Sequence, residues 1–285
     1  MLLEFFKINF PDGIYIYDFE YRQPSGENPT VVCMVLKNIL NDRTYRISGK
    51  DLKKFPVPIT EDSLFVAHYA PAEINSMLSL GFKKPKFIFD TYVESKKLYW
   101  GKQDGFNFKL IGCCARYGIK GVMSQDHKND MTDLIIENET YTKKQMSDII
   151  KYCEEDVLNL EQLFYKILED CEKEGADPAT VLTQATFHGR AMGVCAQIET
   201  NGIPMNIELF NNFNEHFPSI KHDIIVEANK TLNVFNENDK FKKDKFNDLI
   251  IKLGLQDSWP RSERTKKFKE DKPTLKQFKH IPEIQ

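Results

Sequence analysis

Two carboxylates stand two residues apart, Asp18 and Glu20, at the end of a β-forming run that starts at Gly13. Side chains at positions i and i+2 of a strand share one face, so both carboxylates can point at a common spot while Phe19 points into the core on the other side. Close carboxylates raise each other's pKa unless a cation neutralises them, and hard oxygen ligands suit magnesium or manganese. The pair predicts a divalent-metal site, and surface acids at a strand end are the alternative interpretation.

Tyr152 and Asp156 stand four residues apart in a long segment that we expect to be helical. Residues at this spacing lie on the same face of a helix. A phenol one turn away from a metal-bound carboxylate can orient an attacking water. The alternative is an ordinary amphipathic helix in which Tyr152 is half-buried and Asp156 is solvated.

Glu73 falls in the first turn of a helix expected just after a short apolar strand, residues 64–67. α/β proteins place ligand groups at this position, past the carboxyl end of a buried strand. The helix dipole favours a carboxylate there whatever its function, so a purely structural role is the alternative.

The elements that must position these side chains alternate between strands and helices. Strands are predicted at 13–18, 30–36, 44–47, 64–67 and 86–89, and helices at about 71–80, after Asp90, and from a capping box at Thr142 and Gln145 to about 174. Three hairpin-like strands followed by strand–helix units predict an α/β fold with a mixed sheet and helices packed on it. Gly175 to Pro178 marks the predicted boundary between a domain of residues 1–175 and a smaller, mostly helical region of residues 176–285.

Length and composition indicate a chain with a sizeable packed core. Its 285 residues, 41% hydrophobic and 28% charged, suffice for about one or two domains and exclude a disordered chain. No apolar run approaches the roughly 18 residues that cross a bilayer. Glu4 and Lys7 interrupt the apolar N-terminus, which argues against a secretory signal. The six cysteines show no C-x-x-C spacing, so we expect reduced thiols in a cytosolic setting.

The charge is divided unevenly along the chain. Residues 1–238 hold 26 basic and 34 acidic residues, a balance of −8, whereas residues 239–285 hold 13 and 8, a balance of +5. A basic tail behind an acidic body is typical of a protein that handles nucleic acid through a carboxylate-lined site. A solvated, lysine-rich helical surface is the alternative.

Taken in order, the pair Asp18 and Glu20, the acid Glu73 and the motif Tyr152-x-x-x-Asp156 resemble the DEDD exonucleases of the RNase H-like superfamily, in the subgroup with a tyrosine in the third motif. The resemblance implies an RNase H-like fold in which four carboxylates bind two Mg²⁺ or Mn²⁺ ions. It also implies two-metal hydrolysis of the terminal phosphodiester bond in the 3′ to 5′ direction. By position the metal ligands are Asp18, Glu20, Glu73 and Asp156, and Tyr152 orients the nucleophilic water.

One motif departs from the family pattern. The commonest second motif has Asn and Asp four residues apart, whereas this chain has Tyr69 and Glu73. A glutamate keeps the charge but is one methylene longer, so we expect a variant site with an altered rate or metal preference. Tyr69 is a candidate for stacking on the terminal base, and a turn residue packed on the sheet is the alternative.

The second half of the chain extends the resemblance. His188 to Pro204 resembles the segment that follows the exonuclease domain in family A DNA polymerases, the bacterial DNA polymerase I type found in many phages. The stretches 246–255, 259–261 and 272–275 resemble the thumb that continues from it. We find none of the palm and finger motifs of such polymerases, so we do not expect this chain to polymerise DNA. The resemblance implies the proofreading part of a split polymerase or a truncated, stand-alone exonuclease.

Four lysines are candidates for contact with a nucleic-acid backbone. Lys266, Lys267 and Lys269 belong to the basic tail, whose attraction to phosphates weakens with salt. Lys128 lies in a predicted loop between helices, where it either contacts a phosphate near the site or is a solvated loop lysine. Asp90, at the end of a strand of the same sheet, is interpreted as a helix N-cap.

Together these features predict a magnesium- or manganese-dependent 3′–5′ exonuclease that acts on single-stranded or frayed DNA 3′ ends. DNA is the expected partner, a separate polymerase subunit is a candidate partner, and no membrane is expected. The expected location is the cytoplasm of a bacterial or phage-infected cell. Two alternatives stay open. One is the same chemistry on RNA ends, as in RNase D-type enzymes, and the other is a catalytically silent module that binds nucleic acid or a polymerase.

Overall fold

A five-stranded sheet forms the centre of the first part of the chain, with the strand order β3-β2-β1-β4-β5. The computed structural model describes residues 1–102, 105–122, 124–263 and 265–284. The strands are β1 (Gly13–Arg22), β2 (Thr30–Asn38), β3 (Arg43–Ser48), β4 (Ser63–Ala67) and β5 (Phe87–Asp90). The pairs β1–β2 and β2–β3 are antiparallel, whereas β4 and β5 run parallel to β1. The sheet is therefore mixed, which confirms the predicted α/β class.

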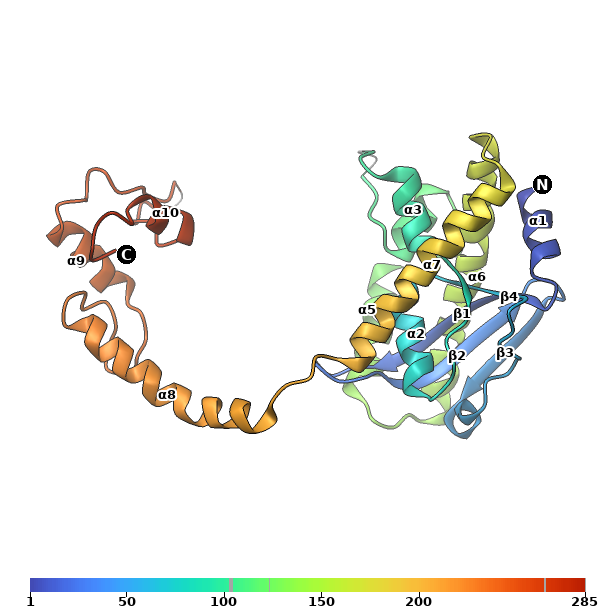
Figure 1. Cartoon of the computed structure of the whole chain (residues 1–285), viewed down its shortest axis with the longest axis horizontal. Coiled ribbons are helices and arrows are strands. Elements are labelled where there is room, and N and C mark those ends of the chain that lie inside the picture. Colours follow the sequence, from blue (N-terminus) through green and yellow to red (C-terminus); the bar gives the residue numbers. More distant parts are fainter. Residues whose placement is uncertain (103–104, 123, 264, 285) are drawn as a thin grey trace. The chain divides into compact units, whose positions relative to one another are not determined.

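Helices connect and cover the strands (Figure 1). They are α1 (Leu2–Asn9), α2 (Ala70–Ser79), α3 (Thr91–Tyr99), α4 (Leu110–Arg116), α5 (Gln125–Glu137), α6 (Lys143–Lys173) and α7 (Pro178–Asn201), and a 3₁₀ helix, η1 (Gly49–Lys53), follows β3. The predicted capping box is present at the start of α6. The Thr142 hydroxyl accepts a hydrogen bond from the Gln145 backbone N–H, and the Gln145 side chain accepts one from the Thr142 backbone N–H.

Alternation along β1 separates two hydrophobic cores. Ile14 and Ile16 face the core that contains α1 and α6, whereas Tyr15, Tyr17 and Phe19 face the core that contains α2. Phe19 is 3% exposed, so its predicted inward orientation is confirmed. Because the side-chain period of a strand is two, the residues that continue the Ile14 and Ile16 face are Asp18 and Glu20. Both carboxylates consequently lie on the side of the sheet that α6 covers.

The N-terminal segment is part of the first of these cores. Leu2 and Phe6 of α1 are fully buried, and the Phe6 ring lies edge-on to Phe89 of β5 and Phe164 of α6, with centroid distances of 6.0 and 6.1 Å. The apolar residues of this segment are therefore used in packing. No helix in the described parts of the chain is both long enough and apolar enough to span a membrane.

The chain divides into two compact units between Gly202 and Ile203, rather than at residue 175 where the sequence places the boundary. Gly175, with φ of 70°, ends α6 and only turns the chain into α7. α7 then packs against α2 and β5, so it belongs to the first unit. Its close approach depends on Gly189, where an added Cβ would lie 2.0 Å from the carbonyl oxygen of Ile88.

The second unit is mostly helical, as the sequence predicts. It comprises α8 (Ile207–Asn229), α9 (Lys243–Lys252), α10 (Lys272–Gln277) and the loops between them. Trp259 is 3% exposed and packs on Phe246 and Phe278, which gives this unit a hydrophobic core of its own.

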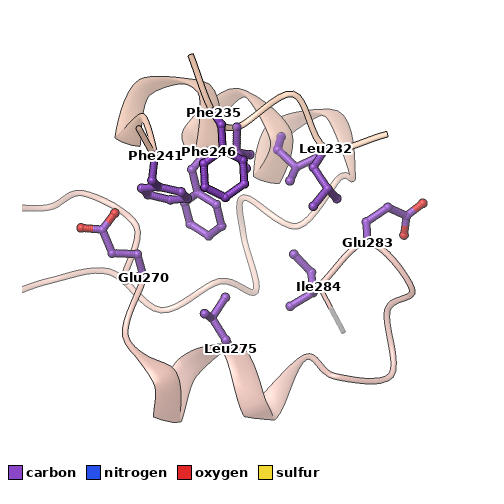
Figure 2. A pocket seen from close by; sticks show the side chains of 10 residues that line it. Leu232, Phe235, Phe241, Phe246, Glu270, Leu275, Glu283 and Ile284 are labelled. Atoms are coloured by element: carbon purple, nitrogen blue, oxygen red, sulfur yellow. The ribbon is translucent and has the colours of Figure 1, made fainter. Parts of the chain in front are cut away.

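An apolar cavity of about 410 Å³ lies within the second unit (Figure 2). Phe235, Phe241 and Phe246 line one side of it, and Leu275 and Ile284 line the other. Most of its lining is hydrocarbon, and its two carboxylates, Glu270 and Glu283, lie on opposite sides of it (Figure 2).

Candidate active site

Asp18 and Glu20 lie where the sheet opens. β1 pairs with β4 only from Gly13 to Ile16, whereas its pairing with β2 continues to Arg22, so β1 extends beyond the predicted end at Asp18. The register with β2 shifts between Glu20 and Tyr21. Bulges of this kind re-aim side chains and are common beside active sites. Both carboxylates are therefore carried by a strand that is held on one side and open on the other.

Glu73 closes this opening from α2. Its Oε2 accepts a hydrogen bond of 2.8 Å from the backbone N–H of Phe19, the residue between Asp18 and Glu20. This N–H is available because β4 ends at Ala67 and the chain turns into α2. The longer glutamate thus reaches β1 directly, and the side chain is only 4% exposed.

Asp90 fixes the start of α2. Its carboxylate accepts hydrogen bonds from the backbone N–H groups of Tyr69 and Ala70, at 3.0 and 2.9 Å, and from Tyr92 at 2.9 Å. Asp90 therefore caps α3, as predicted, and also holds the first turn of α2 that carries Glu73. Tyr69 adopts a left-handed conformation, with φ of 67°, at this junction. A non-glycine residue in that region is strained and is held there by its surroundings.

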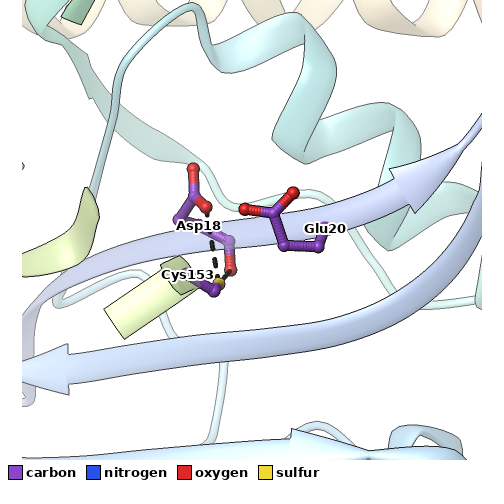
Figure 3. Close-up of side chains that lie close together, drawn as sticks. All are labelled: Asp18, Glu20 and Cys153. Carbon is purple, nitrogen blue, oxygen red and sulfur yellow. Dashed lines mark hydrogen bonds between the residues drawn. The ribbon is translucent and has the colours of Figure 1, made fainter. Parts of the chain in front are cut away.

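α6 brings Tyr152, Cys153 and Asp156 to the same side of the sheet. The Cys153 thiol lies 3.3 Å from the backbone oxygen of Asp18 and 3.4 Å from its Oδ2 (Figure 3). Burial raises the pKa of Cys153, so the thiol stays protonated and donates. Asp18, Glu20 and Cys153 offer ligand atoms within 4.8 Å of one another, and they are the cluster of potential metal ligands found in the described parts of the chain.

Lys128 forms an ion pair with Asp156. Its Nζ lies 2.7 Å from both Oδ1 and Oδ2 of that carboxylate, and both side chains are largely buried. The same ammonium lies 5.6 Å from the centroid of the Tyr152 ring. The prediction of a loop at Lys128 is wrong, because the residue lies in the first turn of α5, which Ser124 caps through the His127 N–H.

The carboxylates raise one another's pKa. Burial and then Asp156 raise the pKa of Asp18 to about 7. Burial and then Asp18 raise the pKa values of Glu20 and Glu73 well above their usual range. Burial also raises the pKa of Asp156, although Lys128 opposes this effect. The four acids therefore form one electrostatically coupled group with too little positive charge around it.

This donor set fits divalent cations. Four carboxylates that repel one another, of which Glu73 and Asp156 are buried and Asp18 and Glu20 half-buried, are stabilised by a hard cation. Oxygen ligands are what Mg²⁺ and Mn²⁺ prefer. Asp18, Glu20, Glu73 and Asp156 are the residues that would hold such ions. Cys153 is better suited to orient Asp18 than to bind these metals, since a neutral thiol is a soft ligand.

Tyr152 and a neighbouring cavity complete the surroundings of the acids. Burial and then Glu20 raise the pKa of Tyr152 far above its usual value, so its hydroxyl stays protonated. A cavity of about 400 Å³ beside Glu20 is lined by Tyr21 and Gln23 and by Thr132, Ile135 and Ile136 of α5. A ligand in this cavity would therefore contact Glu20 directly.

The remaining candidates from the sequence occupy two different units. Tyr69 is 43% exposed at the start of α2, one helical turn before Glu73. Lys266, Lys267 and Lys269 are exposed in the second unit, between α9 and α10. Sequence reasoning missed Cys153, although its position between Tyr152 and Asp156 places it near the same helix face. It also missed that Lys128 pairs with Asp156, because nothing local in the sequence signals a contact across 28 residues.

No family model and no curated protein matches the sequence. Among solved structures, NrnC of Brucella melitensis is similar, with a TM-score of 0.50 and 16% identity over 69% of this chain and 89% of that one. The POL domain of Pol1 from M. smegmatis is similar with a TM-score of 0.54 and 12% identity over 99% of this chain and 44% of that one. RNase D of Escherichia coli aligns with a TM-score of 0.45 and 15% identity over 69% of this chain and 48% of that one. At these identities the likeness concerns the fold.

The first unit has an RNase H-like fold. The mixed sheet with helices on both faces, followed by a helical C-terminal region, agrees with the architecture that the motifs imply.

Proposed function

We propose that this protein is a divalent-metal-dependent 3′–5′ exonuclease that removes nucleotides from the 3′ end of a DNA strand. The observation that carries the proposal is the convergence of four coupled carboxylates, from β1, α2 and α6, with a protonated phenol one turn from the last of them. Structural ion-pair networks also perturb pKa values. In the described parts of the chain, the ion pair of these acids is that of Lys128 with Asp156.

The residues divide the work in a way that suits phosphodiester hydrolysis. Asp18, Glu20, Glu73 and Asp156 would hold divalent cations at the opening of the sheet. Such cations would supply Lewis-acid activation and offset the charge that develops on the phosphoryl group and the leaving oxygen. In this proposal the hydroxyl of Tyr152 orients a water by hydrogen bonding, and the Cys153 thiol, 3.4 Å from Oδ2 of Asp18, holds that carboxylate in position.

The proposal also specifies DNA as the substrate and a polymerase as the enzyme beside which this protein acts. They are supported by the likeness of 99% of this chain to a POL domain whose structure holds a DNA primer-template. They are also supported by the thumb-like sequence after His188 and by the basic residues of the second unit. We propose that the chain proofreads beside a polymerase.

The test of substrate and polarity uses single strands of DNA and RNA of identical sequence, labelled at the 5′ end, with Mg²⁺, Mn²⁺ or EDTA. We expect a ladder of shortening DNA products in either metal, none in EDTA, and protection by a blocked 3′ end. Faster shortening of RNA would replace DNA by RNA as the substrate. Tight binding of either strand without cleavage, by protein shown to be folded, would favour a binding module instead.

A further inference from the structure

Along one side of α3, an aromatic residue, a lysine and a second aromatic residue stand at intervals of four, the last of them being the residue that directly follows the helix. These are Tyr92, Lys96 and Trp100. Residues four apart lie above one another on a helix, and the Lys96 Nζ lies 4.4 Å from the centroid of the Tyr92 ring and 5.6 Å from that of the Trp100 ring. Trp100 is 73% exposed. Tryptophan is highly buried on average, so this exposure is unusual.

The aromatic face continues to the candidate active site. The ring of Tyr69 lies edge-on to that of Tyr92, with the centroids 5.4 Å apart. Asp90 accepts hydrogen bonds from the backbone N–H groups of both tyrosines, so their mutual position is fixed by a fully buried carboxylate. Glu73 follows Tyr69 by one helical turn. The row Tyr69, Tyr92, Lys96 and Trp100 therefore starts beside the acids and leads away from them along α3.

Among the residues that the structure describes, no carboxylate pairs with the ammonium of Lys96. Within the described residues Lys96 makes no ion pair, whereas the next residue, Lys97, contacts both Glu94 and Gln184. An ammonium on the faces of aromatic rings keeps its full charge while the rings hold it in place. This combination of ring faces and a held cation matches what binds single-stranded nucleic acid, where bases stack on aromatics and cations contact phosphates.

We propose that Tyr69, Tyr92, Lys96 and Trp100 form a binding site for the single strand that leads into the carboxylate cluster. Trp100 and the tyrosines stack on bases, and Lys96 contacts a phosphate between them. This inference rests on the proposed function in that the bound strand is the substrate whose 3′ end reaches the acids. Because every base has a π-face, the site binds strands with little regard to sequence.

The test measures the affinity of a 5′-fluorescein-labelled single-stranded DNA by fluorescence anisotropy, in EDTA so that nothing is cleaved. Wild type is compared with Trp100→Ala, Lys96→Ala and the control Lys86→Ala. Lys86 also lies over an aromatic ring, 5.3 Å from the Phe87 centroid, but it directly precedes β5, at the end of the strand remote from Asp90. We expect Trp100→Ala to weaken binding by about fivefold or more. We expect Lys96→Ala to weaken binding. In this variant the slope of log K against the logarithm of the salt concentration should be less steep by about 0.7, because one phosphate contact is lost. Lys86→Ala should bind as wild type.

Intrinsic fluorescence gives a second readout of stacking. The chain has two tryptophans, and Trp259 is 3% exposed in the core of the second unit. Stacking on Trp100 should therefore quench part of the emission as unlabelled DNA is added, and Trp100→Phe should remove that quenching while keeping most of the affinity. Equal affinity of wild type, Trp100→Ala and Lys96→Ala, with no quenching, would overturn the inference.

Failure of the inference is distinguishable from failure of the proposed function. If the wild type shortens DNA but Trp100→Ala leaves both affinity and KM unchanged, the strand enters by another route and the exonuclease proposal stands. If binding depends on Trp100 and Lys96 but the wild type never cleaves in Mg²⁺ or Mn²⁺, the binding site stands and the hydrolytic function falls.

Discussion

Ionisation of Asp18 lowers the stability of the metal-free protein, and the size of this effect depends on pH. Its pKa is about 7 in the folded protein, against 3.8 for the free side chain. Between these values the folded state holds more protons than the unfolded state, so the free energy of unfolding falls as pH rises through this window. In metal-free protein, the free energy of unfolding of Asp18→Asn should exceed that of wild type by about 2 kcal/mol at pH 7.5. At pH 4 the two proteins should differ little. Urea denaturation in EDTA at both pH values measures this, and an Asn variant that is less stable at pH 7.5 contradicts it.

Lys128 is the cation that the acids already have. Removing one partner of a buried ion pair leaves the other uncompensated, which costs about 3 kcal/mol. We expect Lys128→Met to lower the free energy of unfolding by about this amount in EDTA at neutral pH. The matched control is Lys166→Met, which breaks an exposed pair with Glu169 and should change stability by less than about 0.5 kcal/mol. Equal effects of the two substitutions would show that the pair with Asp156 is not formed.

For single residues, the sequence predicts which side chains share one face of a strand or a helix, because this follows from the periodicity of the element. Strand alternation places Asp18 and Glu20 on one face, and helical spacing places Tyr152 with Asp156. The partner of Lys128 and the thiol beside Asp18 depend on how α5 and α6 pack on the sheet. Such contacts join residues far apart in the chain, and no local pattern encodes them.

The contact between α7 and β5 depends on one missing side chain. A Cβ at Gly189 would meet the backbone oxygen of Ile88 at 2.0 Å, whereas one at Gly193 would meet the flexible Ile88 Cδ1 at 3.3 Å. Gly189→Ala should therefore push α7 from the sheet and destabilise the protein by about 1–3 kcal/mol. Gly193→Ala should be close to neutral, since alanine's helix propensity offsets a small clash. Chemical denaturation of both variants checks this, and a harmless Gly189→Ala would contradict the close packing.

The strands, α2 and the start of α6 are predictable because their signals are local. Apolar runs bounded by turn residues mark the strands, and the capping box marks the start of α6. The length of β1 is not predictable in the same way. β1 continues past Asp18 because β2 still pairs with it after β4 has ended, which is a property of the sheet.

The division into two units predicts that the first unit folds and acts without the second. All of Asp18, Glu20, Glu73, Tyr152 and Asp156 lie in residues 1–202, which have their own two-sided core. A protein truncated after Gly202 should fold cooperatively and keep metal-dependent cleavage. Its KM for DNA should rise by about tenfold, because the contacts that we propose between Lys266, Lys267 and Lys269 and the nucleic-acid backbone are lost. Circular dichroism and steady-state kinetics measure both, and an unfolded product would contradict the division.

The boundary itself shows what a sequence pattern leaves open. Gly175 to Pro178 signals a turn, and a turn between two helices looks the same whether or not it separates two units. The deciding feature is the glycine-rich face of α7, whose packing on β5 assigns the helix to the first unit.

We propose above that the carboxylate cluster is a hydrolytic centre. The most direct measurement is the rate of shortening of a 5′-labelled single-stranded DNA by wild type and by the Asp18→Asn/Glu20→Gln double variant, in Mg²⁺, Mn²⁺ and EDTA. We predict metal-dependent shortening by the wild type and a loss of at least about a hundredfold in the double variant, because charge stabilisation at the reacting phosphate is removed. Equal cleavage by both proteins, or no cleavage by folded wild type in either metal, would contradict the account.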